Sequence, residues 1–360
     1  MKIFSTILIA FTLGTASSLA QTVISSYKPG VTSEGAVYYL PKTAIRVTMQ
    51  VEKSTYTPGE FCKYSEKYLR IKDVPTNAST KYRILSVKQE PFAIADTSKC
   101  YAVKFDAKTV ACNVRLSNEG ILLAINTDAK QQPKSAPAPT QQPRPLKNSP
   151  KSYLSEEILS AGSTAKMAEL TAQEIYELRE SKSMLAKGQA DFMPKDGEQL
   201  KLMLEELNTQ NEALTSLFIG TTENDTTTHT FTCVVDKPTK RDILFRFSPE
   251  YGLVDNDDLS GTPYYINIED LKTVAEPETV DPKKAAKPQQ SGIYVNVPGK
   301  MRATIFDAKN QIVSNEFAAG QFGNVELLSG VLFNKKYTTR LLLNALTGAV
   351  EKLEAEQPKK

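Results

Sequence analysis

An α+β protein is expected from the order in which three patterns follow one another along this 360-residue sequence. Residues 21–127, and again 219–275 and 292–353, show the period-two alternation of apolar and polar side chains that is typical of β-strands. Residues 151–218 instead show helical spacing and are rich in good helix formers. The sequence therefore predicts two β-rich units, each sandwich-like or barrel-like, on either side of a central antiparallel helical hairpin.

The N-terminus has the three parts of an export signal. Lys2 provides the positive start, Ile3–Leu13 an apolar stretch, and Ser18–Ala20 a small-x-small cleavage site. The apolar stretch is too short to cross a bilayer, which takes ~18 or more apolar residues. We expect residues 1–20 to be a signal peptide that is cleaved after Ala20, where no cysteine stands to carry a lipid. The mature chain is then exported, periplasmic or outer-membrane associated, not lipid-anchored, and without a transmembrane segment.

The region 21–127 is expected to form an N-terminal β domain that contains one short helix. Residues 45–51 alternate apolar and polar side chains, as in a half-buried strand. Further strands are expected at 82–88 and 121–126. A short helix is expected after the Pro58–Gly59 breaker, because aromatic and apolar residues between 61 and 69 have helical spacing.

Four cysteines in an exported chain raise the question of disulfides. Residues 101–105 and 110–114 are expected to form a hairpin whose turn sets Cys100 opposite Cys112. Directly opposed residues have Cβ atoms ~4.5–5.5 Å apart, so a disulfide needs modest adjustment. The alternatives are a Cys100–Cys112 disulfide or two small buried hydrophobic residues on one strand face.

Two linkers are expected. Residues 128–150 contain six prolines and almost no large apolar side chains, so they cannot bury enough surface to offset the entropy of ordering. Residues 276–291 contain three prolines and a lysine cluster. The last residues, 354–360, are expected to be a solvated tail.

The central segment predicts two helices that lie side by side. The first has one apolar face and is expected to end at Gly188. The second is expected to start near Asp196. The apolar face of the first includes Met167, Leu170, Leu178 and Leu185, and that of the second Leu200, Met203, Leu207, Leu214 and Leu217. Residues 153–218 carry 12 acidic and 6 basic side chains, a net charge of −6 that we assign to a solvated outer face.

Strands return after residue 218, with one group in 219–275 and another in 292–353. Residues 37–49 and 293–305 show a weak internal similarity, with three identities in thirteen positions. A duplicated β unit and a coincidence of strand composition both explain this similarity.

Catalytic and metal chemistry have little support in the sequence. His229 is the only histidine and lies in a threonine-rich strand, no serine has a G-x-S-x-G setting, and no cysteines or histidines have zinc spacing. The balance of 44 basic and 41 acidic residues does not suit a protein that neutralises phosphates, so no nucleic-acid partner is expected. We assign no catalytic, cofactor-binding or metal-ligating residue and expect no cofactor.

Two sequence patterns are compatible with a bound ligand, a calcium ion in one case and a sugar in the other. Asp255–Asp258 resembles the start of a calcium loop, although Leu259 stands where an oxygen ligand belongs, and a turn between strands is the alternative. Tyr38–Tyr39 and Tyr264–Tyr265 lie in expected strands, where one ring of each pair points outward and suits a sugar face.

Five segments are distinctive: ILSAGSTAKMAELTAQEIYELRESKSMLAKG, DFMPKDGEQLKLMLEELNTQNEALTSLFIGTT, VYYLPKTAIRVTMQVEKSTYTPGEF, LFRFSPEYGLVDNDDLSGTPYY and QFGNVELLSGVLF. In them the chain resembles, over nearly its whole mature length, a family of exported Bacteroidales proteins known as a domain of unknown function. The resemblance implies a Gram-negative envelope setting and no known catalytic residues. Exported proteins of that lineage receive O-linked glycans at signals similar to Asp225–Thr227, so Thr226 is a candidate O-glycosylation site.

These observations together predict a non-enzymatic component of the cell envelope, with a structural, assembly or protein-binding role and another envelope protein as its partner. A glycan-binding module is the alternative. A carboxylate-based hydrolase is the lesser alternative, because distant Asp and Glu residues can meet in space.

Overall fold

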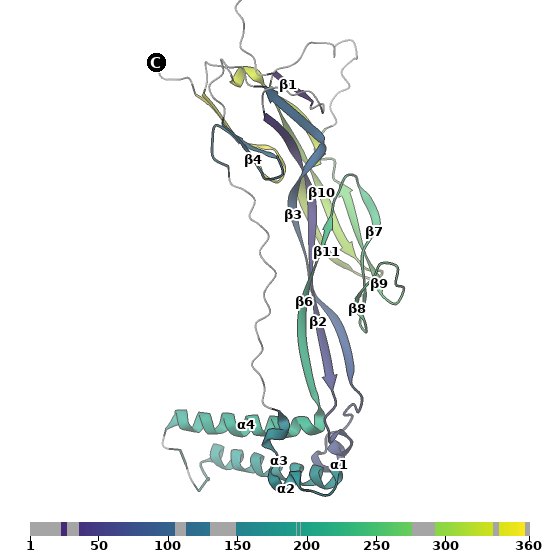
Figure 1. Ribbon diagram of the computed structural model, residues 1–360, viewed down its shortest axis with the longest axis vertical. Helices are drawn as coiled ribbons and strands as arrows, with labels where there is room; N and C mark the ends of the chain where they lie inside the picture. The colour runs from purple at the N-terminus through teal and green to yellow at the C-terminus, as the bar shows by residue number, and fades with distance from the viewer. Residues whose placement is uncertain are drawn as a thin grey trace, which may run out of the picture.

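The structure, a computed structural model, describes residues 23–26, 36–104, 113–129, 149–191, 193–194, 196–275, 292–333 and 338–356. These residues form an elongated β-rich molecule with a helical module at one end (Figure 1). The described strands make three open sheets, so the architecture is sandwich-like and not a barrel. The α+β class and the helical pair within it are confirmed.

The first sheet has the order β1-β3-β2-β6, and its described pairs are antiparallel. Its strands are β1 (Val23–Ser26), β3 (Ser79–Lys104), β2 (Ala36–Thr57) and β6 (Thr221–Cys233). β2 and β3 form a long hairpin, and β6 pairs with β2 without a register shift from Ile45↔Cys233 to Thr57↔Thr221. Together β2, β3 and β6 form a ribbon that runs from the upper β region to the helical module (Figure 1).

The second sheet has the order β11-β10-β9-β7-β8. Its strands are β7 (Thr239–Ser248), β8 (Gly252–Val254), β9 (Thr262–Asp270), β10 (Gly292–Phe306) and β11 (Gln311–Ser329). The third sheet has the order β13-β12-β5-β4. Its strands are β4 (Val114–Leu116), β5 (Leu122–Ile125), β12 (Thr338–Leu343) and β13 (Val350–Glu356), with a short 3-10 helix at Gly330–Phe333 before β12. β13 thus continues three residues into the segment 354–360 that we expected to be a tail.

The cores combine segments from before and after the helical pair. Tyr38 and Leu40 of β2 are buried together with Ile293 of β10 and Leu341 of β12. Ile45 and Val47 of β2 are buried with residues of β9, β10 and β11. The segment before the helices therefore folds together with the segment after them.

Two amide side chains, one half-buried and one buried, form hydrogen bonds between these layers. Gln321 of β11 donates from Nε2 to the carbonyl oxygens of Thr43 and Val235, and its Oε1 accepts from the Thr43 amide at 2.9 Å. Asn296 of β10 donates from Nδ2 to the carbonyl oxygens of Pro41 and Thr347. Because buried donors are costly when unpaired, these contacts favour one relative placement of the sheets.

The two segments of similar sequence, 37–49 and 293–305, occupy similar settings. Each lies at or near the start of a long strand that leads an antiparallel hairpin, β2–β3 in one case and β10–β11 in the other. Their matching tyrosines meet, since the Tyr38 hydroxyl donates to the Tyr294 carbonyl at 3.2 Å and accepts from the Tyr294 amide at 2.9 Å. The two hairpins therefore lie against each other at the same position of the shared pattern.

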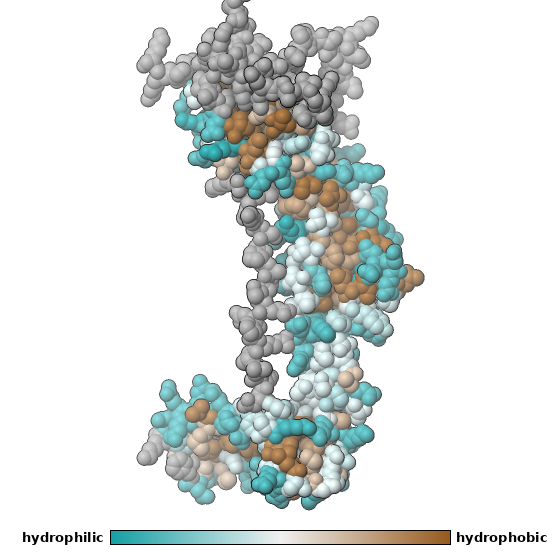
Figure 2. All heavy atoms as spheres, in the orientation of Figure 1, coloured by the Kyte–Doolittle hydropathy of each residue, from teal (hydrophilic) through white to brown (hydrophobic). Residues whose placement is uncertain are grey.

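The lower half of the ribbon is polar. None of the described β2 residues after Val51 is buried, and none of β6 from Thr221 to Thr228 is buried either. Figure 2 shows this stretch in pale and teal colours between the brown apolar clusters of the middle sheet and of the helical module. The ribbon thus carries the module beyond the β cores.

The helical module contains the 3-10 helices η1 (Cys62–Tyr64) and η2 (Pro150–Tyr153), and the helices α1 (Ser65–Leu69), α2 (Glu156–Leu159), α3 (Thr164–Lys187) and α4 (Gly197–Ile219). The expected helix ends are confirmed: α3 ends at Gly188, and the Asp196 carboxylate accepts from the Gln199 amide at 2.7 Å at the start of α4. The expected short helix after Pro58–Gly59 is η1 with α1. Among the described helices we find none with the length and apolar composition that crossing a bilayer requires.

Candidate functional site

The most distinctive surface lies on the helical module, and the way this module is attached defines its orientation. The Phe61 amide donates to the Leu217 carbonyl at 2.7 Å, which joins the end of β2 to the end of α4. The Tyr56 hydroxyl donates to the carbonyl oxygens of Ile219 and Pro75 at 3.0 and 2.9 Å. Because these bonds involve backbone on both sides of the junction, they favour one orientation of the helices on the ribbon.

The helices are well packed near this junction, at what we call the inner end of the module. The rings of Phe61 and Phe218 lie 5.4 Å apart and are fully buried. The Tyr176 hydroxyl donates to the Tyr68 carbonyl at 3.0 Å, and so joins α3 to the end of α1. The buried core here consists of Phe61, Leu69, Leu154, Ile158, Ala168, Ala172, Ile175, Leu178, Leu214, Leu217 and Phe218.

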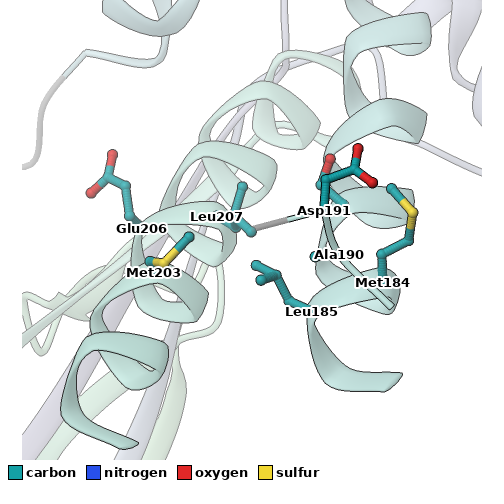
Figure 3. A pocket seen from close by; sticks show the side chains of 8 residues that line it. Met184, Leu185, Ala190, Asp191, Met203, Glu206 and Leu207 are labelled. Carbon is teal, nitrogen blue, oxygen red and sulfur yellow. The ribbon is translucent and has the colours of Figure 1, made fainter. Parts of the chain in front are cut away.

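The opposite end of the α3–α4 pair, the outer end, is open. A pocket of about 420 Å³ lies between the end of α3 and the start of α4. We call it the outer pocket; it is lined by Ser181, Met184, Leu185, Ala190, Asp191, Met203, Glu206 and Leu207. Figure 3 shows Met203 and Leu207 of α4 facing Leu185 of α3 across it.

The floor of the outer pocket is apolar and its sides are exposed. Leu185 is buried, whereas 40% of Met184 is exposed at the mouth. Accessible apolar surface with polar groups around it is a candidate for an interaction site. Methionine side chains suit such a site because they are flexible and adapt to varied partners.

The rim of the outer pocket is acidic. Asp191 and Glu206 line it, and the Glu206 carboxylate accepts from Gln210 Nε2 at 3.0 Å, a bond that leaves its charge in place. Two cations of α3 donate to amides of α4, Arg179 Nε to Asn211 Oδ1 at 3.2 Å and Lys182 Nζ to Asn208 Oδ1 at 2.7 Å. The negative charge of the rim is thus not paired with these cations.

The residues singled out from the sequence as modification or processing sites lie elsewhere. Thr226 is exposed in β6, opposite Glu52 of β2. Ala20 and Cys112 lie outside the described residues, so the signal cleavage and the Cys100–Cys112 disulfide stay predictions. Cys100 is half-buried in β3, opposite Tyr39 of β2.

The hairpin that we expected between 101–105 and 110–114 is wrong for the part that the structure describes. β1 and β2 pair with the two edges of β3 at Tyr101–Val103, so no edge is left there for a third strand. Val114 pairs with Ile125 of β5 instead. Local alternation identified these strands, but β3 pairs with distant strands, and β4 pairs with the strand that follows it.

Histidine and cysteine chemistry gain no support from the geometry. His229 is half-buried in β6, and its Nε2 lies 3.2 Å from the hydroxyl of its strand neighbour Thr227. Burial, with a smaller effect of Asp242, raises the pKa of the Cys233 thiol to about 11. Cys233 therefore stays a protonated thiol at neutral pH, whereas a nucleophile needs a thiolate.

The acidic loop 255–258 is organised by an arginine. Arg246 donates from Nε to the Asn256 carbonyl at 2.7 Å and from Nη1 to the Gly261 carbonyl at 3.0 Å. The Asp258 carboxylate accepts from the Ser260 amide, which holds the pKa of Asp258 below its usual value. The geometry is that of the turn between strands, and among the described residues no group of three metal-ligating side chains gathers.

The paired tyrosines do not form bare sugar platforms. Tyr38 is fully buried, and Tyr264 stacks on Phe245 at 4.7 Å. Arg241 lies over the Tyr265 ring at 4.9 Å, and Phe306 stacks beside that ring. The rings of Tyr38, Tyr264 and Tyr265 are therefore each covered, at least on one face, by other protein groups.

The outer pocket is the feature that sequence reasoning missed. Leu185, Met203 and Leu207 were correctly placed on the facing sides of the two helices. Periodicity does not show, however, that their packing stops short of the outer end. The sequence signal available was the presence of a methionine, Met184 or Met203, near this end of each helix.

Comparison with protein-family models identifies the chain. The model described as "Domain of unknown function (DUF4831)" matches residues 34–351, so the chain belongs to this family. The matched range includes the whole helical module and the β-rich segments except β1 and most of β13. No curated protein and no solved structure matches the chain.

Proposed function

We propose that the protein is a non-enzymatic component of the cell envelope that binds another envelope protein, with the outer end of the helical module as its binding surface. The observation that carries the proposal is the placement of this end. The polar ribbon holds it away from the β cores, and the bonds at the junction keep it oriented.

Three surface carboxyl groups lie in settings that suit surface contacts and not a general acid. A general acid needs a raised pKa, which burial or a neighbouring like charge provides. The carboxyl groups with a resolved change, Glu169, Asp258 and Glu354, all have a pKa below the usual value because each accepts hydrogen bonds. They suit stabilising contacts on a surface.

The envelope setting is inferred from the sequence. The expected export signal, with cleavage after Ala20, supports a location in the periplasm or at the outer membrane without a lipid anchor. In that setting Thr226 is the proposed O-glycan acceptor, since its side chain is exposed on β6. An unshifted mass for the tryptic peptide with Thr226 from native cells would contradict the modification.

Site-specific crosslinking in native cells tests the binding function. A photo-crosslinking residue at exposed Gln189, next to the outer pocket, is compared with one at exposed Lys309, in the turn between β10 and β11. We expect one discrete protein adduct from position 189 and none from position 309. Equal adducts from both positions, or none from position 189, would overturn the proposal.

The glycan-binding alternative predicts a different result. Tyr251 is the large aromatic residue that the structure leaves most open, with 65% of its surface exposed. A glycan-array signal that Tyr251→Ala abolishes, together with the absence of a protein adduct at position 189, would favour that alternative.

A further inference from the structure

We infer that the outer pocket is a docking site for a basic amphipathic helix of the partner protein, which inserts an apolar side chain between α3 and α4 and places lysine or arginine against the rim. This inference rests on the proposed function and adds the chemistry of the partner. The shape of the site, its lining and its charge each support it.

The shape fits an inserted side chain. The pocket of about 420 Å³ lies within the size range of about 300–1,000 Å³ that is usual for ligand sites. It lies between two antiparallel helices, where a third helix can lay its apolar face into the groove. Leu185, Met203 and Leu207 supply the apolar walls.

The lining of the outer pocket leaves room for an aliphatic side chain of a partner, whereas the inner end is filled. Near the junction, Phe61, Phe218 and Leu214 leave no room because they are fully buried against one another. At the outer pocket the lining side chains Met184 and Met203 are not fully buried. An aliphatic anchor would cover methionine surface that is now in contact with water, and removing apolar surface from water favours binding.

The charge selects a cationic partner. The segment 153–218 has a net charge of −6, and Asp191 and Glu206 lie on the rim itself. Arg179 and Lys182 bond to asparagines of α4 and not to these carboxylates, so neither of the two forms an ion pair with the rim. An acidic rim around an apolar floor attracts a basic segment, speeds its approach and repels an acidic one.

Methionine methyl groups give a direct readout of this site. The chain from Gln21 onward is labelled with ¹³C at the methionine methyl groups, and a synthetic amphipathic helix of leucine and lysine is added. We expect the signals of Met184 and Met203 to shift with peptide concentration. The signals of Met49 and Met301, which are fully buried in the β cores, should not move.

Matched variants separate the pocket from the rest of the surface. Met203→Glu should weaken binding of the leucine–lysine peptide at least tenfold, whereas Leu259→Glu, at an exposed position of the loop before β9, should leave it unchanged. Glu206→Lys should weaken binding about fivefold. Glu212→Lys makes the same charge change on α4 outside the pocket and should have less effect.

Three outcomes would overturn the inference. If a leucine–glutamate peptide binds equally well, the acidic rim does not select the partner. If the Met184 and Met203 signals do not change, the peptide does not bind in the outer pocket. If the Met184 and Met203 signals shift with protein concentration in the absence of peptide, the occupant of the outer pocket is a second copy of the chain. The crosslinking test at position 189 reads the proposed function separately, because it detects a native partner of any composition.

Discussion

The inner and outer ends of the α3–α4 pair differ although the same two helices form both. At the inner end, Phe61 and Phe218 are fully buried and join the helices to the ribbon. At the outer end, Met184 and Met203 line an open pocket with an acidic rim. The difference separates attachment to the ribbon, at the inner end of the hairpin, from the surface for which we propose recognition, at its outer end.

The largest effect should come from removing the aromatic contact at the inner end. Phe218→Ala leaves a cavity beside Phe61, and such a change in a core costs about 3–5 kcal/mol of unfolding free energy. Met203→Ser, the truncation at the outer end, should cost less than about 1.5 kcal/mol because the site is already open. Urea unfolding followed by circular dichroism measures the unfolding free energy of both variants. Equal losses would contradict the difference between the inner and outer ends.

Two glycines, one at each end of the α3–α4 pair, test the comparison of the inner and outer ends further. Gly220 has φ +78° and ψ −177°, a conformation that only glycine adopts readily, and an added Cβ would lie 2.5 Å from the Thr57 carbonyl oxygen. Gly220→Ala should therefore cost about 3 kcal/mol. Gly188→Ala at the end of α3 should cost about 1 kcal/mol, because its backbone is left-handed but no described atom lies within 4 Å. Thermal unfolding of the two variants should show the larger loss for Gly220→Ala.

A smaller effect is expected from the cap that starts α4 beside the outer pocket. Asp196→Ala removes the carboxylate that accepts from the Gln199 amide at 2.7 Å, which should cost about 1 kcal/mol. The conservative Asp196→Asn should retain most of that stability. Hydrogen exchange should show faster opening of the first turn of α4 in Asp196→Ala, and no change near Phe218. Unchanged exchange in that turn would contradict the role of the cap.

The smallest effect is electrostatic. Lys166 donates to the Glu169 carboxylate at 2.8 Å and holds the pKa of Glu169 below its usual value. A lowered carboxyl pKa stabilises the fold above the unfolded-state pKa of about 4.3, and this contribution is lost as pH falls through the folded pKa. Lys166→Met should return the pKa of Glu169 toward its usual value, as measured by a carboxyl ¹³C titration. High salt should reduce the shift in the unchanged protein, since the pair is exposed.

Much of the local structure was predictable from particular residues. The alternation at 45–51 predicted β2, and Gly188 and Asp196 predicted the ends of α3 and α4, because turn and cap residues act on their own backbone. The pairing of strands was not predictable in this way. β3 pairs with β1 and β2 where a local hairpin was expected, and β4 and β5 lie in one sheet with β12 and β13.

The sequence by itself determined the α+β class, the helical hairpin with its apolar faces, and the acidic character of that hairpin. Only the tertiary structure decided that the ribbon carries the helices beyond the β cores and that their packing ends before the outer pocket. The physical reason is that periodicity identifies which face of an element seeks burial, whereas the partner that covers it, or leaves it uncovered, depends on segments far away in the chain.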